Sequence, residues 1–343
     1  MKSPATLVER SFTGRRWFLQ EPDPERTVRL SQRLHLPDIV ARVLACRDLD
    51  QDEAKAFLDP RIRELLPDPS HLLGLDAAVE RLAKAIRERS PIGIIGDYDV
   101  DGATSTALLV RYLQAFGCPF EVVIPDRLAD GYGPNIRAVD RLADSGVGLL
   151  VTLDSGTTAH EALEHARTRG LDTVVVDHHL AENRLPPALA VVNPNRLDQE
   201  SPLGGLAAVG VTFVLLVGLN RAASHGDVPD LMRWLDLVAL GTVCDVVPLS
   251  GLNRALVRHG LKIAASGGVA GMGALARVAG IQRVSEAMQF GFAFGPRINA
   301  GGRLGRSDLG WKLLSTDDGD DAESIAIALD ELNRKRQTLE RDA

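Results

Sequence analysis

The segment IGIIGDYDVDGATSTALL, residues 92–109, decides the fold class of this chain. Its first four residues, three isoleucines and a glycine, predict a short strand that is buried on both faces. Three aspartates follow, and residues 103–116 then predict a helix that ends at Gly117. A strand that leads directly into a helix is the repeating unit of a parallel α/β sheet.

The same alternation of strand and helix continues on both sides of this segment. Further strands are predicted at 120–124, 148–153, 172–176 and 190–193, and further helices at 77–89, 135–144 and 158–168. The strands are short runs rich in Val, Ile and Leu, which is typical of strands covered by helices on both faces. The sequence therefore predicts an α/β fold with a parallel sheet flanked by helices.

Outside this core the pattern is mainly helical. Residues 1–75 are punctuated by prolines, with short helices predicted near 38–46 and 51–58, and residues 207–240 are mostly helical. We divide the chain into a helical lead segment (1–75), an α/β domain (76–250), a helical region (251–320) and the start of a connecting helix (321–343). The last helix lacks a capping signal, so we expect the native chain to continue.

Composition and charge indicate a globular protein of a reducing compartment. Of the 343 residues, 45% are hydrophobic and 25% are charged, and the three cysteines are widely spaced. The first residues lack the apolar core of a secretory leader, and the apolar runs are too short to cross a bilayer, so we expect a cytoplasmic protein. The formal net charge of −7 argues against nucleic-acid binding unless cations neutralise some of the acidic residues.

An acidic cluster of Asp97, Asp99 and Asp101 stands where the first strand ends, which is where parallel sheets bind ligands. A solvated acidic turn is one interpretation, although apolar elements lie on both sides of it. A calcium loop of the EF-hand type also begins D-x-D-x-D-G, but its twelfth position, which must be a glutamate, is Leu108. We favour a catalytic metal site, because carboxylates this close repel one another unless a cation lies between them.

Other enzyme classes fit the sequence less well. The G-x-S-x-G elbow of serine hydrolases and the phosphate-binding G-x-x-x-x-G-K-[ST] loop are both absent from the sequence. A phosphatase of the haloacid dehalogenase type would use Asp97 as its nucleophile and Asp99 as its acid. It would also need a lysine at the site, and Lys262 stands in no fitting context.

Polar residues also follow three later elements. Asp154 follows one strand, the run Asp177, His178 and His179 follows the next, and Asp245 ends an apolar helical stretch. Because the carboxyl ends of parallel strands meet at one edge of a sheet, we expect these side chains to converge. Aspartate and neutral histidine bind Mn²⁺ and Mg²⁺, and six such ligands exceed the needs of one ion, so we predict two ions bridged by Asp154. The predicted ligands are Asp97, Asp99, Asp101, Asp154, His178 and Asp245.

These four clusters, in this order, resemble the motifs of the DHH family of phosphoesterases. Longer stretches are similar to one exonuclease branch of that family. They are GDYDVDGATSTALL at 96–109, RLADGYGPN at 127–135, DLVALGTVCDVVPL at 236–249 and GPRINAGGRLG at 295–305. The resemblance covers about residues 15–340.

The resemblance implies a metal-dependent 5′→3′ exonuclease that hydrolyses single-stranded DNA to 5′-mononucleotides, in DNA repair and recombination. It implies Mn²⁺ or Mg²⁺ as cofactor and single-stranded DNA as substrate, and it suggests a single-strand-binding protein or a helicase as partner. We also expect a monomer. The family pattern continues after the connecting helix into a DHHA1 domain and an OB-fold, which are apparently missing from this sequence. Two alternatives stay open, namely a DHH phosphoesterase for short oligonucleotides or cyclic dinucleotides, and an inactive scaffold.

The same resemblance assigns roles beside the ligand set. His179 would contact the scissile phosphate or complete the metal shell, and Asp177 would orient the two histidines. Asp236 is a weaker candidate for the last ligand. Ser155 and Gly156 stand where the family usually has Asn-Gly, which is a mild departure.

Within the segment 295–305, three residues match the family's segment near the nucleic acid, namely Arg297, Asn299 and Arg303. Arginine is a bidentate phosphate donor, and a catalytic role is also implied for Arg297. The glycines at 301–302 would form a turn whose backbone N–H groups bind an anion. The competing interpretation of Arg297 and Arg303 is an arginine that is solvated or paired within the structure.

Overall fold

The computed structural model describes residues 5–47, 49–126, 131–223 and 228–342. The start of the predicted motif 127–135 and residues 224–227 of the predicted helical stretch lie outside the described residues. The chain divides into two compact units, Met1–Leu65 and Leu66–Ala343, so residues 66–75 belong to the larger unit. Within the described ranges, no helix combines the length and the apolar character needed to cross a membrane.

The first unit contains a β-hairpin and short helices. The strands are β1 (Ala5–Val8) and β2 (Trp17–Leu19), and the helices are α1 (Pro24–Leu34), α2 (Asp38–Ala45), α3 (Gln51–Leu58) and α4 (Ile62–Leu65). A capping box of Asp50 and Glu53 begins α3. Leu30, Leu44 and Ala54 bring α1, α2 and α3 together in one buried core. The predicted helices near 38–46 and 51–58 are confirmed, whereas the hairpin and α1 were not indicated by the sequence patterns.

The second unit is built on a parallel sheet with the strand order β4-β3-β5-β6-β7. The strands are β3 (Ile92–Ile95), β4 (Phe120–Val123), β5 (Leu149–Leu153), β6 (Asp172–Val176) and β7 (Ala190–Val192). Ile92 lies opposite Phe120 on one side and Leu149 on the other. Both β3 and β5 are buried along their whole length, as expected of strands covered on both faces. The predicted α/β fold with a parallel sheet is confirmed.

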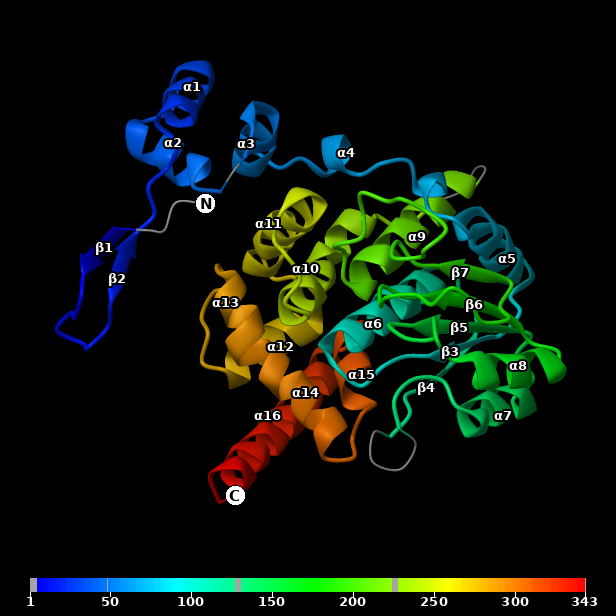
Figure 1. Cartoon of the computed structure of the whole chain (residues 1–343). Helices are drawn as coiled ribbons and strands as arrows, with labels where there is room; N and C mark the ends of the chain where they lie inside the picture. The colour runs from blue at the N-terminus through cyan, green and yellow to red at the C-terminus, as the bar shows by residue number, and fades with distance from the viewer. Residues whose placement is uncertain (1–4, 48, 127–130, 224–227, 343) are drawn as a thin grey trace. The chain divides into compact units, whose positions relative to one another are not determined.

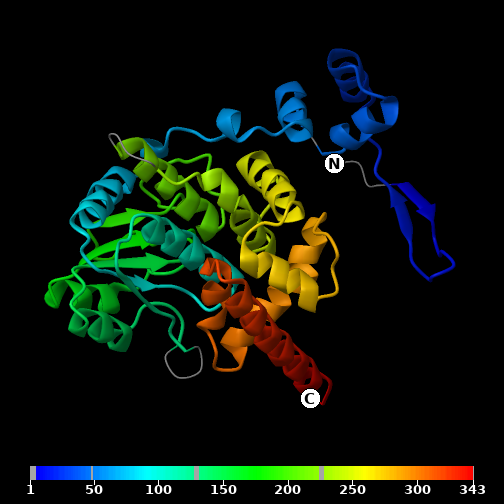
Figure 2. The ribbon, with the colours of Figure 1, turned by 180° about the vertical axis from the view of Figure 1, so that it is seen from behind.

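Helices cover both faces of this sheet (Figures 1 and 2). One face carries α7 (Ile136–Asp144) and α8 (His160–Thr168), and the other carries α5 (Leu75–Glu88), α6 (Val100–Ala115) and α9 (Ala208–Ala222). Leu142 of α7 and Leu163 of α8 share a buried cluster with Leu150 of β5 and Val175 of β6. Burial of each leucine side chain contributes roughly 2 kcal/mol to folding. The two helical layers thus fix the sheet and leave its carboxyl edge for the loops that follow the strands.

A second core joins α6 to the helices that follow the sheet. These are α10 (Leu235–Cys244), α11 (Gly251–Ala265), α12 (Ala270–Val278), α13 (Ala287–Gln289), a π-helix (Phe290–Phe294), α14 (Gly295–Arg303), α15 (Leu309–Ser315) and α16 (Gly319–Asp342). Ala107 of α6 shares one buried cluster with Leu240 of α10, Phe290 of the π-helix and Leu329 of α16. The helices after residue 250 therefore share a core with α6. Short 3₁₀ turns occupy Pro69–His71 and Leu231–Trp234, so the predicted helical stretch 207–240 is two helices, α9 and α10.

The predicted glycine turn at 301–302 is instead part of the helix α14. Both glycines are buried at close contacts with other parts of the chain. A Cβ atom at Gly302 would lie 2.8 Å from the Cβ of Tyr98, and one at Gly301 would lie 2.8 Å from the carbonyl oxygen of Arg306. These positions need glycine because the helix packs closely against its neighbours. The prediction of an anion-binding turn there is wrong.

Candidate metal centre

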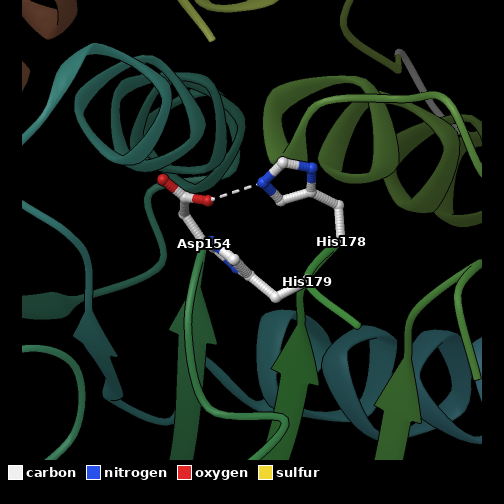
Figure 3. A group of neighbouring side chains, drawn as sticks. All are labelled: Asp154, His178 and His179. Carbon is white, nitrogen blue, oxygen red and sulfur yellow. Dashed lines mark ion pairs between the residues drawn. The ribbon is translucent and has the colours of Figure 1, made fainter. Parts of the chain in front are cut away.

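The predicted acidic residues and histidines converge at the carboxyl edge of the sheet. Figure 3 shows the side chains of Asp154, after β5, and His178, after β6, turned toward each other above the strand ends. Three groups of side chains have possible ligand atoms within 4.8 Å of one another: Asp97, Asp99 and Asp154; Asp101, His178 and Asp245; and Asp154, His178 and His179. All six predicted ligands are therefore brought together, with His179 beside them.

The N-terminus of α9 holds the carboxylate of Asp101. This side chain sits in the first turn of α6 and is 2% exposed. Its Oδ2 accepts a hydrogen bond from the backbone N–H of Ala208 at 2.6 Å, and its Oδ1 accepts one from Val209 at 2.9 Å. The positive end of the helix dipole favours the ionised form. Asp101 Oδ2 also lies 3.8 Å from Nε2 of His178, so α9 aims this carboxylate at the centre.

Asp154 stands in a strained backbone conformation at the end of β5. Its φ of +60° is in the left-handed region, which non-glycine residues adopt at a cost of about 1–3 kcal/mol. Its Oδ1 lies 3.3 Å from Nε2 of His178. Among the described residues, this buried oxygen and Oδ2 of Asp245 have no hydrogen-bond donor. Buried oxygens without a partner are rare, and a bound cation would supply a partner to both of these.

His178 is oriented by a backbone carbonyl. Its Nδ1 lies 3.1 Å from the carbonyl oxygen of Leu206, which can only accept, so Nδ1 carries the proton. The lone pair of Nε2 then faces Asp154 and Asp101. Histidines that bind metals typically donate their other ring N–H to a carbonyl or a carboxylate in this way. Asp245 Oδ2, at the end of α10, lies 3.7 Å from the ring nitrogen Nδ1.

Asp177 organises the segment that follows β6. It is 1% exposed and accepts hydrogen bonds from the backbone N–H groups of Thr157, His178 and His179. Its Oδ1 also accepts from Nδ1 of His179 at 2.7 Å. Asp177 thus contacts the ring of His179 but only the backbone of His178, and its predicted role in orienting both histidines stays a prediction. The bond to Asp177 raises the pKa of His179.

Three further residues support the centre, and the sequence analysis did not single them out. The hydroxyl of Tyr132 donates to the backbone oxygen of Asp154 at 2.8 Å and lies 3.4 Å from Nε2 of His179. Asn193 donates to the carbonyl of His179 at 2.8 Å, and Asn195 donates to that of His178 at 2.5 Å. The sequence signal that could have identified the two asparagines is their position, because both follow β7 at the same edge of the sheet as the predicted ligands.

Burial and mutual repulsion keep the carboxyl groups of the centre from ionising easily. Burial raises the pKa of Asp97 to about 7, and the charge of Asp99 adds to this. Burial raises the pKa of Asp101 and of Asp154 well above the usual range, and repulsion between neighbouring carboxylates adds to the effect. Burial also raises the pKa of Asp245. A nearby cation would favour the charged form of these carboxyl groups. Carboxylate oxygens together with an imidazole nitrogen are donors that fit Mn²⁺ or Mg²⁺.

Asp236, the weaker ligand candidate, lies elsewhere. It is fully buried in the first turn of α10 and belongs to none of the three groups of possible ligands found in the described residues. Its Oδ2 accepts a hydrogen bond from the backbone N–H of Val269 at 2.8 Å, and Val269 is the residue that precedes α12. Asp236 therefore caps α12, and the structure favours Asp245 as the last ligand.

The structure gives Arg297 a partner within the chain. Its Nε donates to Oδ1 of Asp330 at 2.9 Å and its Nη1 donates to the carbonyl of Ala293 at 2.7 Å. An arginine paired within the structure was the competing interpretation of Arg297. The catalytic role of Arg297 stays a prediction. The exposed Arg303 and half-buried Asn299 line a pocket of about 180 Å³ beside Cys244, together with Arg336. The sequence analysis did not single out Arg336, which α16 brings to this pocket.

The parallel sheet and the carboxylate and histidine cluster at its edge define a protein of the DHH class. The family described as "DHH family, N-terminal domain" matches residues 91–242. The single-stranded-DNA-specific exonuclease RecJ of Escherichia coli is 40% identical over 317 residues, which cover 89% of this chain and 54% of that protein. The chain therefore belongs to the DHH family and, within it, to the RecJ group.

Solved structures agree with this assignment. RecJ from Thermus thermophilus in complex with Mn²⁺ matches with a TM-score of 0.80 at 34% identity, over 94% of this chain and 46% of that one. A structure of exonuclease RecJ bound to manganese matches with a TM-score of 0.73 at 37% identity, over 81% of this chain and 69% of that one. The chain spans about half the length of the curated relatives it matches.

Proposed function

We propose that this chain is a metal-dependent exonuclease that hydrolyses single-stranded DNA from the 5′ end to 5′-mononucleotides, in DNA repair and recombination. The observation that carries the proposal is the convergence of the predicted ligands around two buried carboxylate oxygens, of Asp154 and Asp245, that lack donors among the described residues. The names of the relatives support the substrate class, since they are single-stranded-DNA-specific exonucleases.

Two ions of Mn²⁺ or Mg²⁺ are the proposed cofactors, because solved RecJ structures hold one or the other metal. The group of Asp97, Asp99 and Asp154 would hold one ion, and the group of Asp101, His178 and Asp245 would hold the other. Asp154 and His178 each belong to two of the three ligand groups, and of the two only the carboxylate has two oxygen atoms to offer, which supports Asp154 as the bridge. Ions bound there would acidify a water molecule and polarise a phosphoryl oxygen.

His179 and Arg297 are the proposed groups that stabilise charge on the phosphate. Asp177 fixes Nδ1 of His179 and raises the pKa of that ring, which favours a positive charge at the edge of the centre. A positive charge held in place near the phosphoryl oxygens lowers the energy of the transition state. Asn299 and Arg303, in the pocket beside Cys244, are proposed DNA contacts.

The remaining proposals concern the setting of this activity. Single-stranded DNA is the proposed partner, held mainly through its phosphates, and binding should weaken with salt. A single-strand-binding protein or a helicase is the proposed protein partner. The protein is proposed to work as a monomer in the cytoplasm.

The test compares turnover of a 5′-labelled single strand, its duplex and a dinucleotide in Mn²⁺, with Asp154→Asn as the inactive control. The proposal expects mononucleotides from the single strand, little from the duplex, and loss of activity in the variant. Faster turnover of the dinucleotide would favour an enzyme for small nucleotides. Absence of turnover of all three substrates by a protein that still binds Mn²⁺ would favour an inactive scaffold.

A further inference from the structure

A groove of about 550 Å³ runs along α11, outside the metal centre. Its lining comes from the loop before α11, one face of that helix and the segment before α13. The lining residues are Leu249, Arg254, Val257, Arg258, Leu261, Lys262, Ala265, Arg283, Ser285 and Ala287. The sequence analysis assigned no role to Lys262, and in the structure this residue lines the groove.

The groove is strongly basic in a chain that is acidic overall. Four of its lining residues are Arg or Lys, and none of the described residues that line it is acidic, whereas the whole chain has a net charge of −7. Arg254, Arg258 and Lys262 are spaced four residues apart, so they lie on one face of α11, about 6 Å apart along its axis. Arg283 adds a fourth positive charge from outside the helix. The groove therefore suits a ligand that carries regularly repeating negative charges.

The groove begins close to the metal centre. Leu249, the first lining residue in the sequence, is only four residues after the predicted ligand Asp245. Four residues of chain span at most about 14 Å, so the lining starts within that distance of the ligand's Cα atom. Since α10 and α11 also pack against each other, a linear ligand could reach from the centre into the groove.

The uncharged part of the lining is mostly aliphatic. Leu249, Val257 and Leu261 contribute to it, and no aromatic residue is among the described residues that line the groove. Stacking of bases on aromatic rings is the usual way to bind bases of any sequence. Its absence from this lining indicates that a nucleic acid would be held here by its phosphates, with its sugars over the aliphatic side chains.

We propose that this groove binds the phosphodiester backbone of the single strand without regard to base sequence. The bound part of the strand lies beyond the scissile bond, away from the 5′ end. This proposal rests on the exonuclease function proposed above and adds a binding path to it. An acidic peptide also complements a basic groove, but two observations favour the DNA strand. The positive charges repeat at one helical turn, and the lining begins at the loop that follows a ligand of the centre.

The test is the salt dependence of binding in EDTA, where cleavage does not occur. A fluorescent strand of about 16 nucleotides is titrated with the protein at several salt concentrations. The double variant Lys262→Gln, Arg283→Gln removes two exposed charges of the groove. Each phosphate contact contributes about 0.7 to the slope of log K against log salt for single strands, so the slope should become shallower by about 1.4.

A matched control carries the same change of charge elsewhere. Lys84 and Arg87 are exposed on α5, which packs on β7 and α9 at the other end of the second unit (Figures 1 and 2). The double variant Lys84→Gln, Arg87→Gln should keep the wild-type slope. With a dinucleotide as ligand, too short to reach the groove, both double variants should bind as the wild type does. In Mn²⁺, the groove variant should raise KM for the long strand and keep kcat.

Some outcomes would overturn the proposal, and another would separate it from the proposed exonuclease function. A slope that becomes equally shallow in the groove variant and the α5 control would show that only net charge matters, and a wild-type slope in both would show that the groove does not bind the strand. Binding of an acidic peptide that is lost in the groove variant, with the DNA slope unchanged, would assign the groove to a protein partner. If the groove variant changes the slope while the wild type shows no turnover in Mn²⁺, the binding path stands and the proposed exonuclease function fails.

Discussion

Oδ1 of Asp177 accepts a hydrogen bond from Nδ1 of His179 at 2.7 Å. Burial raises the pKa of Asp177, but the hydrogen bonds from His179 and from Thr157 outweigh this and hold it below its usual range. The carboxylate thus stays charged, and it raises the pKa of His179 in turn. The pair places a ring with a fixed proton on Nδ1 beside the candidate metal centre.

Asp177→Asn should lower the pKa of His179 and reduce activity by about 10- to 100-fold, because the charged acceptor that orients the ring is lost. The pKa is measured by NMR titration of the metal-free protein, and activity is measured as kcat over a range of pH. An unaltered pKa of His179 in the variant would contradict the role of this pair.

Asp154→Asn should stabilise the metal-free protein, because it removes one charge from a buried cluster of carboxylates. Asparagine tolerates the left-handed backbone at this position better than other non-glycine residues. A gain of about 1 kcal/mol would raise Tm by about 2–4 °C in EDTA. The variant should also lose most of the stabilisation that Mn²⁺ gives to the wild type.

Asp101→Asn is the contrasting variant, since both oxygens of Asp101 accept hydrogen bonds from backbone N–H groups of α9. An amide can accept through only one of these positions, so the metal-free protein should lose about 1–3 kcal/mol. Thermal unfolding in EDTA compares the two variants directly. If both variants shift Tm in the same direction, the distinction between a free and a capped carboxylate is wrong.

The metal-free protein should become less stable as the pH rises from about 4 to about 7. Asp97 has a pKa of 3.8 when unfolded and about 7 when folded, so between these values the folded state holds more protons. The free energy of unfolding then falls by up to about 1.4 kcal/mol per pH unit for this group. The stabilisation from His179 is complete below its unfolded pKa of 6.5 and is lost as the pH rises further, which adds to the trend.

Thermal unfolding in EDTA across this pH range measures the effect. Asp97→Asn should flatten the decline, because the substituted side chain does not titrate. Saturating Mn²⁺ should oppose the decline, since metal ligands bind in their deprotonated form and affinity rises with pH. A metal-free protein whose Tm rises steadily over the same range would mean that Asp97 does not resist ionisation.

Asp236→Asn should reduce stability without weakening metal binding. The change removes a charged acceptor for the N–H of Val269 at the start of α12, which is worth about 1–2 kcal/mol. Asp245→Asn is the matched comparison, because it alters a predicted ligand at the other end of the same helix. Mn²⁺ affinity by calorimetry and unfolding by urea separate the two effects. Equal losses of Mn²⁺ affinity in both variants would return Asp236 to the ligand set.

Arg297→Met should destabilise the fold by about 3 kcal/mol, because it leaves the buried Asp330 with Arg334 as its only ion-pair partner among the described residues. Arg297→Lys keeps the charge but loses the planar donor group, and should reduce kcat if the guanidinium contacts phosphate. Asp330→Asn is the control that leaves Arg297 itself unchanged. Normal kcat in Arg297→Lys, together with a lowered unfolding free energy, would assign Arg297 a purely structural role.

Local patterns predicted the sheet well and some of the helices poorly. The apolar runs that become β3, β5 and β6 are visible because strands buried on both faces must be apolar at nearly every position. The glycines of α14 led to the wrong prediction of a turn at 301–302, because a glycine in a sequence can indicate either a flexible backbone or a close contact. Only packing against Tyr98 and Arg306 distinguishes the two.

The candidate centre was predicted from strand-end positions, but the residues that support it were not. Five of the six ligands follow strands, and parallel strands bring their carboxyl ends to one edge, whereas Asp245 follows the helix α10. Tyr132 and Asn195 act through contacts with the backbone of Asp154 and His178, which no local pattern encodes. The pairing of Arg297 with Asp330 also joins residues 33 positions apart in the sequence.

By itself, the sequence determined the alternation of apolar strands and helices, and with it the edge at which the acidic residues and histidines gather. The order of strands and the side-chain period of each element impose these features locally. Only the tertiary structure decided which carboxylates accept hydrogen bonds from a helix N-terminus and which have no partner. It also decided whether a basic side chain pairs with a carboxylate or lines a groove. Those outcomes depend on distances between segments far apart in the chain, where burial and charge act through space.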